Sequence, residues 1–238
     1  MIISHKHKFI YFKTHKTAGT STELALSRHC GSDDIVTASS VESEILQDGI
    51  YSNKPRNISN TNSRDFRNHM SPGGVKKAIM QRYGNREGEV IWNTYYKIAN
   101  VRDPWDRVVS YWCWDRNGGL RNSSREVEDS FEEYVYNKST MSGSRRVIHQ
   151  VKPWATVGGQ VIIDKFIRFE YLQQDVNEVL GNLGLPSNKL PKAKGLVRKK
   201  ACGNSPYPEY YNNDTRQIIH ELFIDDINYF NYEFGLNK

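Results

Sequence analysis

The chain has 238 residues, of which 37% are hydrophobic and 25% charged, with 5 Trp, 14 Tyr and 9 Phe. This composition provides enough apolar and aromatic material for a buried core, and it excludes a chain that is disordered throughout. The net charge of +6 favours an anionic partner, a class that includes a nucleotide cofactor, a sulfated or acidic glycan and nucleic acid.

Residues 9–12 (FIYF) predict a short buried strand, and the segment after it has the composition of an anion-binding loop. A helix is expected to begin near Thr20, so its first backbone N–H groups and its dipole would favour a phosphate-like anion. A lysine adds a mobile positive charge, and hydroxyl side chains add donors. An ordinary tight turn with a solvated lysine is the alternative. The expected anion-binding residues are Lys16, Thr17, Ala18, Gly19, Thr20 and Ser21.

Helices and strands alternate along the rest of the chain. Asp103 is the expected N-cap of a helix that begins at Pro104 and has an apolar face from Trp105 to Trp112. The other expected elements are an exposed loop at 53–68, a short helix from 71 to 80, strands at 95–101 and 161–169, a short helix at 131–136, a helix at 172–183, a basic loop at 186–208 and a final helix from about Asp214.

This alternation is typical of a parallel sheet with helices on both faces. We therefore predict an α/β fold of three layers, α/β/α, with a P-loop-like parallel sheet in a single domain over 1–238. Ligands of such sheets bind beyond the carboxyl ends of the strands. The loop after the first strand and the start of the Asp103 helix are both expected there.

A second anion site is predicted at the start of the Asp103 helix. Arg102 ends the preceding strand and Ser110 lies two turns into the helix, so a guanidinium and a hydroxyl could converge on one phosphate. In the alternative interpretation, Arg102 pairs with Asp103 or Asp106, and Ser110 is a neutral helix residue.

The two motifs together resemble those of the sulfotransferase family. Lys16-Thr-Ala-Gly-Thr-Ser21 is similar to the loop that holds the 5′-phosphosulfate of the cofactor, and 101–111 (VRDPWDRVVSY) is similar to the 3′-phosphate motif, with Arg102 and Ser110 in matching positions. Residues 166–172 (FIRFEYL) and the aromatic segment 210–232 resemble stretches of the carbohydrate sulfotransferase branch. The resemblance covers most of the chain and is most specific in the first two motifs.

This resemblance implies a sulfotransferase fold and a sulfuryl donor, 3′-phosphoadenosine 5′-phosphosulfate (PAPS), with 3′-phosphoadenosine 5′-phosphate (PAP) as product. It implies transfer to an acceptor hydroxyl, of a saccharide by the branch resemblance, without a metal ion. Family loops commonly have proline directly before the lysine, where this chain has His15. We interpret His15 as a structural substitution, with an imidazole near the sulfuryl group as the alternative.

Lys16 and His69 are the expected catalytic residues. Lys16 would stabilise the leaving 5′-phosphate, and a histidine is the side chain best suited to accept a proton near neutral pH. His69 lies between the two cofactor motifs, as does the histidine that supplies the base in some glycan sulfotransferases. His15, Glu44 and Glu170 stay open as alternative bases. Residues 192–200 (KAKGLVRKK) are either a solvated loop or a source of 3′-phosphate ligands at Arg198, Lys199 or Lys200.

The remaining features concern the environment of the protein. Three widely spaced cysteines, Cys30, Cys113 and Cys202, favour reduced thiols in a reducing compartment. There is no run of about 18 apolar residues, and a first strand that begins near Lys8 leaves no room for a signal peptide. We therefore expect a soluble, cytoplasmic protein. The resemblance implies a relative of bacterial or viral type, because the Golgi members of the family carry a membrane anchor and disulfides and neither is expected here.

Two other functions are compatible with part of the pattern. A nucleotide kinase-like phosphotransferase could use a similar sheet, but a Walker A loop has a first glycine and places its lysine after the second, unlike Lys16-Thr-Ala-Gly19. A non-enzymatic polyanion or nucleic-acid binder could use the +6 charge, but the basic residues are interspersed with acids and no nucleic-acid motif occurs.

Overall fold

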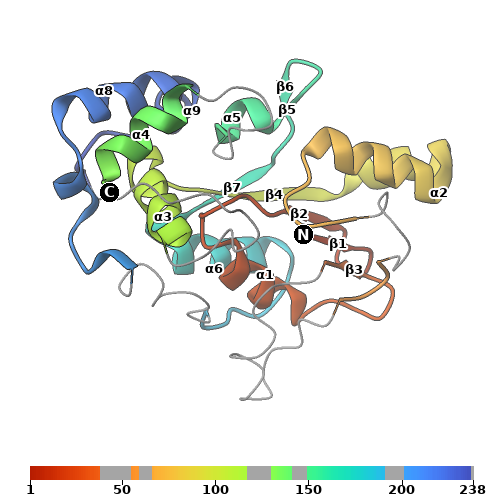
Figure 1. Ribbon diagram of the computed structural model, residues 1–238. Coiled ribbons are helices and arrows are strands. Elements are labelled where there is room, and N and C mark those ends of the chain that lie inside the picture. Colours follow the sequence, from red (N-terminus) through yellow and green to blue (C-terminus); the bar gives the residue numbers. More distant parts are fainter. Residues whose placement is uncertain (38–54, 59–65, 117–129, 141–148, 191–200, 237–238) are drawn as a thin grey trace. The chain divides into compact units, whose positions relative to one another are not determined.

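The computed structural model describes residues 1–37, 55–58, 66–116, 130–140, 149–190 and 201–236 (Figure 1). The chain divides into two compact units, each built from two separate stretches. The first unit contains Met1–Val101 and Trp154–Ala193, and the second contains Arg102–Pro153 and Lys194–Lys238. The single domain over 1–238 stays a prediction. The basic segment 192–200 and most of the predicted loop 53–68 lie outside the described residues.

A five-stranded sheet forms the centre of the first unit, with the strand order β3-β1-β2-β4-β7. The strands β2, β4 and β7 are parallel, whereas β1 and β3 pair antiparallel at one side. The predicted parallel sheet is therefore confirmed for its central and last strands, and the antiparallel edge was not anticipated. The strands are β1 (Ile2–Ser4), β2 (Phe9–Phe12), β3 (Ile35–Val36), β4 (Tyr96–Val101) and β7 (Lys165–Arg168).

Helices cover both faces of this sheet, which confirms the three-layer prediction for the first unit. Successive residues of β2 alternate between two cores: Phe9 and Tyr11 pack with α1 and α6, and Ile10 and Phe12 pack with α2. Figure 1 shows α1 and α6 on one side of the strands and α2 on the other. The helices are α1 (Gly19–Ser27), α2 (Pro72–Thr94) and α6 (Leu172–Asn182).

Three elements of the first unit differ from the sequence prediction. β1 precedes the strand that was expected to be first, and its residues Ile2 and Ile3 are fully buried. α2 is longer than the predicted short helix because the chain continues through a kink at Gly84 (φ 74°). The strand expected at 161–169 is instead a β5–β6 hairpin (Thr156–Val157 and Gln160–Val161) followed by β7.

The second unit is helical and has an aromatic core. Asp103 caps α3 as predicted: its Oδ1 accepts hydrogen bonds from the N–H groups of Trp105 (2.8 Å) and Asp106 (3.2 Å). The predicted apolar face of α3, including Trp105 and Trp112, is buried against α4, α8 and α9. The elements are α3 (Pro104–Arg116), α4 (Phe131–Thr140), α5 (Val151–Trp154), of which the last residue belongs to the first unit, η4 (Tyr207–Tyr210), α8 (Asn213–Leu222) and α9 (Ile224–Phe230).

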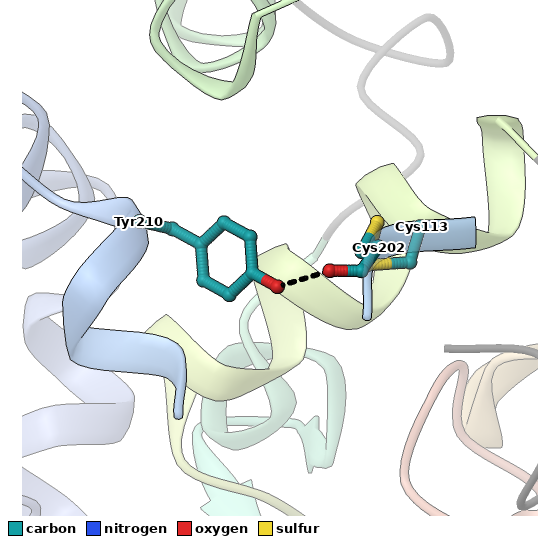
Figure 2. The surroundings of a disulfide bond; sticks show 3 residues. All are labelled: Cys113, Cys202 and Tyr210. Atoms are coloured by element: carbon teal, nitrogen blue, oxygen red, sulfur yellow. Dashed lines mark hydrogen bonds between the residues drawn. A yellow bond between two sulfur atoms is a disulfide. The ribbon is translucent and has the colours of Figure 1, made fainter. Parts of the chain in front are cut away.

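A disulfide bond between Cys113 and Cys202 joins α3 to the segment before η4 (Figure 2). The two Cα atoms are 5.7 Å apart, and the Tyr210 hydroxyl donates a hydrogen bond of 2.8 Å to the Cys202 carbonyl. The prediction of three reduced thiols is therefore wrong for Cys113 and Cys202, because the fold brings together residues that are 89 positions apart. Cys30 is a free thiol, half-buried after α1. The inference of a reducing compartment loses its support, and the cytoplasmic location stays a prediction.

None of the helices in the described part of the chain combines the length and the apolar character needed to span a bilayer. Within the same ranges, no group of three or more His, Cys, Asp or Glu side chains is placed to hold a metal ion.

Reduction of the disulfide should destabilise the protein. The bond closes a long loop, so its loss should lower the free energy of unfolding by about 2–4 kcal/mol. Thermal unfolding with and without reductant measures this effect. A Cys113→Ala, Cys202→Ala double variant should unfold at the temperature of the reduced protein, and reductant should not change that temperature. In Cys30→Ala, reductant should lower the unfolding temperature as it does in the wild type. Three titratable thiols in the untreated, unfolded protein would contradict the bond.

Candidate functional site

The loop between β2 and α1 has a backbone conformation that resembles a nest, a concave arrangement of N–H groups that can accept an anion. Lys16 and Ala18 both adopt the left-handed conformation, with φ of 59° and 61°. Alternation of left-handed residues with the start of a helix turns successive N–H groups toward one side. Ala18 is the N-cap of α1 and supplies no side-chain hydrogen bond to the helix, and the first turn contains no acidic residue. The positive end of the helix dipole is therefore not neutralised by side chains of its own first turn.

Gly19 is required by the close packing beneath this loop. A Cβ atom at this position would lie 2.9 Å from Cγ of Lys13, 3.2 Å from the Tyr11 hydroxyl and 3.3 Å from the Thr14 carbonyl oxygen. Two of these neighbours take part in hydrogen bonds within the core: the Tyr11 hydroxyl donates to Oδ1 of Asn100, and the Thr14 carbonyl accepts from Oγ1 of Thr17. The glycine of the motif is thus explained by sterics at the point where α1 begins.

The buried amide of Asn100, in the interior of β4, holds the loop in place. Its Nδ2 donates to the Thr17 carbonyl (3.1 Å) and to Oγ1 of Thr22 (2.9 Å). Its Oδ1 accepts from the Tyr11 hydroxyl at 2.6 Å, and its backbone carbonyl accepts from Oγ1 of Thr14 at 2.7 Å. Asn100 is fully buried, so these bonds are made without competition from water. One residue of β4 therefore fixes both ends of the loop that follows β2.

An ion pair lies under the same loop. Nζ of Lys13 is 2.5 Å from Oε2 of Glu23, and both side chains are buried. Glu23 also pairs with the amino group of Met1. Burial and the negative charge of Glu23 raise the pKa of Tyr11 well above its usual value, so the Tyr11 hydroxyl stays a neutral donor. The charge of Lys13 is compensated within the core, whereas Lys16 lies half-buried in the loop itself.

The hydroxyl side chains of the loop differ in their surroundings. Thr17 is fully buried, and its Oγ1 lies 2.7 Å from Oγ1 of Thr14. Ser21 is 8% exposed, and Thr20 is half-buried at the start of α1. The predicted residues of this motif therefore span the end of the loop and the first turn of α1, and the Thr17 hydroxyl is hydrogen-bonded to Thr14 within the loop.

His69 lies beside this loop, although 50 residues separate the two in sequence. Its Nδ1 is 3.0 Å from the carbonyl oxygen of Lys13. Its ring stacks on His15, with centroids 3.6 Å apart and planes inclined by 15°. Neighbouring residues anchor the segment, because Phe66 is buried in the core and Oδ1 of Asn68 accepts a hydrogen bond from Thr37.

The contact with Lys13 defines the protonation of the neutral His69 ring. A carbonyl oxygen only accepts hydrogen bonds, so Nδ1 of His69 must carry the proton. In the neutral ring, Nε2 is then the nitrogen with the lone pair. This tautomer is the one in which His69 can accept a proton at Nε2.

Arg102 and Ser110 belong to the second unit. The guanidinium of Arg102 binds the carboxylate of Asp106, with Oδ2 2.8 Å from Nε and 2.6 Å from Nη2. This is one of the pairings given as an alternative, and Arg102 is only 7% exposed. Ser110 is half-buried on α3. Asp103 is occupied by the helix cap and by the Tyr207 hydroxyl, which donates to its Oδ2 at 2.8 Å.

Among the alternative bases, Glu170 is half-buried in η3 (Phe169–Tyr171), which follows β7. Glu44, Arg198, Lys199 and Lys200 lie outside the described residues. The roles of all predicted site residues stay predictions.

Sequence reasoning missed Asn100, Lys13 and Glu23. A polar residue inside the apolar strand YKIANV was a usable signal, because a buried amide must find hydrogen-bond partners. Glu23 gave a weaker signal, since an acid in a short helix is usually solvated.

A comparison with protein families gives a match to the family described as "Sulfotransferase family", over residues 1–233. The chain is a member of the sulfotransferase family. A search of curated proteins and a search of solved structures each gave no significant match. Membership assigns this sulfotransferase to the enzymes that transfer a sulfuryl group, and its α/β fold with a central, partly parallel sheet agrees with that assignment.

Substitution of Gly19 should damage this sulfotransferase more than substitution of its neighbour. Gly19→Ala should lower the free energy of unfolding by about 1–3 kcal/mol, because the new Cβ would lie 2.9 Å from Cγ of the buried Lys13 side chain. Ala18→Gly is the matched control: it relieves a left-handed alanine and should change stability by less than about 1 kcal/mol. Urea unfolding measures both. Equal stability of the two variants would contradict the packing argument.

Proposed function

We propose that the protein is a PAPS-dependent sulfotransferase that transfers the sulfuryl group to an acceptor hydroxyl, by in-line displacement. The observation that carries the proposal is the nest of Lys16–Ser21 at the start of α1, held by Asn100, in a chain of the sulfotransferase family. Family membership favours sulfuryl transfer over the nucleotide kinase and the polyanion binder.

The Lys16–Ser21 loop would bind the 5′-phosphosulfate end of the donor. The N–H groups at the start of α1 and the Lys16 ammonium would stabilise the negative charge that develops on the leaving 5′-phosphate. Thr20 and Ser21 would add hydroxyl donors. Thr17 would contribute through its backbone N–H, because its hydroxyl is engaged with Thr14.

Arg102 and Ser110 would bind the 3′-phosphate. A guanidinium carries five N–H donors, so the contacts of Nε and Nη2 with Asp106 are compatible with a phosphate on the same side chain. Asp106 would then act as the group that orients Arg102. This assignment depends on the motif at 101–111, and a ligand that differs only in the 3′-phosphate tests it.

His69 would be the general base. As the acceptor oxygen bonds to sulfur, the bond between sulfur and the 5′-phosphate oxygen breaks, and Nε2 of His69 takes the acceptor proton. The Nδ1–H tautomer set by the Lys13 carbonyl is the one that this step requires. A saccharide hydroxyl is the proposed acceptor, on the resemblance of residues 166–172 to the carbohydrate branch.

Binding of PAP should stabilise the protein specifically. At a PAP concentration about 100-fold above the dissociation constant, stabilisation of about 2.7 kcal/mol is expected, and it should appear as a rise in Tm. AMP, which lacks the 3′-phosphate, and ATP should give smaller shifts. Lys16→Ala and Arg102→Ala should each reduce the shift with PAP, and Arg102→Ala should also abolish the preference for PAP over AMP.

Lys77→Ala is the matched control for charge removal, because Lys77 is exposed on α2. It should respond to PAP like the wild type. Equal shifts with PAP and AMP in the wild type would remove the 3′-phosphate site from the proposal. A Lys16→Ala variant with full sulfuryl transfer would defeat the mechanism.

Loss of the His69 imidazole should slow the chemical step without weakening the binding of PAP. His69→Ala should keep the thermal shift with PAP and lose about 100-fold or more in turnover, as expected when a general base is removed. A labelled sulfuryl donor with a screen of saccharide acceptors measures the turnover. His29→Ala is the control, since His29 lies after α1 and should be dispensable. Near wild-type turnover in His69→Ala would contradict its role as base and leave His15, Glu44 and Glu170 as the candidates.

A further inference from the structure

The contact between His15 and His69 is not explained by either motif. The two rings are nearly parallel, at 3.6 Å between centroids and 15° between planes. His15 lies in the loop directly before Lys16, and His69 comes from the segment before α2. His69 itself has φ of 60°, a conformation that a non-glycine residue adopts only when its surroundings impose it.

Two contacts from one loop act on the His69 ring in different directions. The hydrogen bond from Nδ1 to the Lys13 carbonyl, at 3.0 Å, fixes where one edge of the ring points. This single hydrogen bond still allows the ring plane to rotate about the line from Nδ1 to the carbonyl oxygen. The face of His15 opposes that turn, because a tilt of either ring would break the stack. Together the two contacts fix the plane of the ring and therefore the direction of Nε2.

We propose that His15 is a positioning residue, which holds the His69 imidazole in one orientation and one tautomer through the ring stack. The inference rests on the proposed function only in giving His69 the role of base. It joins the loop and the proposed base in one arrangement, since residues 13 and 15 contact His69 while residues 16–21 would bind the donor. The role needs a flat ring at position 15 and does not need a titratable one.

This requirement distinguishes the positioning role of His15 from the role of a base and from that of a side chain that only fills space. His15→Phe keeps a flat ring of similar size and removes both nitrogens, whereas His15→Leu keeps the bulk and removes the flat face. A positioning role predicts that Phe rescues and Leu does not. If His15 were the base, both variants would be inactive.

The direct test is the nitrogen-15 NMR spectrum of His69 in the full-length protein without any ligand. Long-range proton–nitrogen correlations distinguish the Nδ1–H tautomer from the Nε2–H tautomer, and His69→Asn identifies the signals. We expect the Nδ1–H pattern in the wild type and in His15→Phe, and averaged tautomers in His15→Leu and His15→Ala. His7→Ala, a histidine of the β1–β2 connection, should leave the His69 signals unchanged.

Kinetics provide the second readout. His15→Leu and His15→Ala should lose roughly 10-fold in kcat with the KM of the acceptor changed less than about twofold, because a displaced base slows chemistry without weakening binding. His15→Phe should stay within about threefold of the wild type. The thermal shift with PAP, retained in every variant, shows that the loop is still folded.

The outcomes distinguish this inference from the proposed function. Unchanged His69 tautomers in His15→Leu and His15→Ala overturn the positioning role, whatever the activity. Inactivity of His15→Phe with normal His69 signals overturns it as well, and identifies His15 as a reacting group. Averaged tautomers with unchanged kcat support the positioning of His69 and contradict its role as base.

Discussion

The hydrogen bonds of one buried amide hold the backbone on which the proposed chemistry depends. Left-handed backbone at Lys16 and Ala18 costs about 1–2 kcal/mol for each residue, and a free loop would relax out of it. Asn100 prevents this because it binds the Thr17 carbonyl and Thr22 from the neighbouring parallel strand. Since these bonds form within the protein core, the nest has its shape before any anion arrives. Preorganised donors of this kind stabilise a developing charge without reorganisation during the reaction.

The electrostatics of the loop follow from the same arrangement. Glu23 compensates the charge of Lys13 in the core, whereas the half-buried Lys16 and the positive end of the α1 dipole lie in the loop itself. The Lys13 carbonyl meanwhile faces His69. Lys13 thus forms the buried ion pair through its side chain and contacts the proposed base through its backbone carbonyl. A change in the Lys13–Glu23 ion pair would therefore also displace the Lys13 carbonyl that contacts His69, the proposed base.

Sequence patterns over a few neighbouring residues predicted most helices and strands. They could not predict contacts between residues that lie far apart in the chain. Alternation and capping signals identified β2, β4, α3 and α6, because burial and local hydrogen bonds produce those periods. β1 was missed because it has only three residues and is followed by the polar segment HKHK, so the sequence shows too little periodicity there. The length of α2 was underestimated because its backbone is non-helical at Gly84, where the two parts of the helix meet in a kink. The Lys16–Ser21 loop was identified from its composition. Its support by Asn100, its contact with His69 and the Cys113–Cys202 bond involve residues far apart in sequence, so only the folded chain shows them.

The surroundings of Cys30 affect how the protein can be oxidised. Burial raises the pKa of the Cys30 thiol to about 12, and its Sγ faces the Leu26 carbonyl at the end of α1. Thiolates, not thiols, attack disulfides, so burial in the folded first unit lowers the reactivity of Cys30. Cys113 emerges from the ribosome long before Cys202, and during that interval Cys30 is the other cysteine that has already been made. Early closure of the β1–β2–α1 region would thus prevent a wrong crosslink, and the order of synthesis and the burial of one side chain would together select the correct pair.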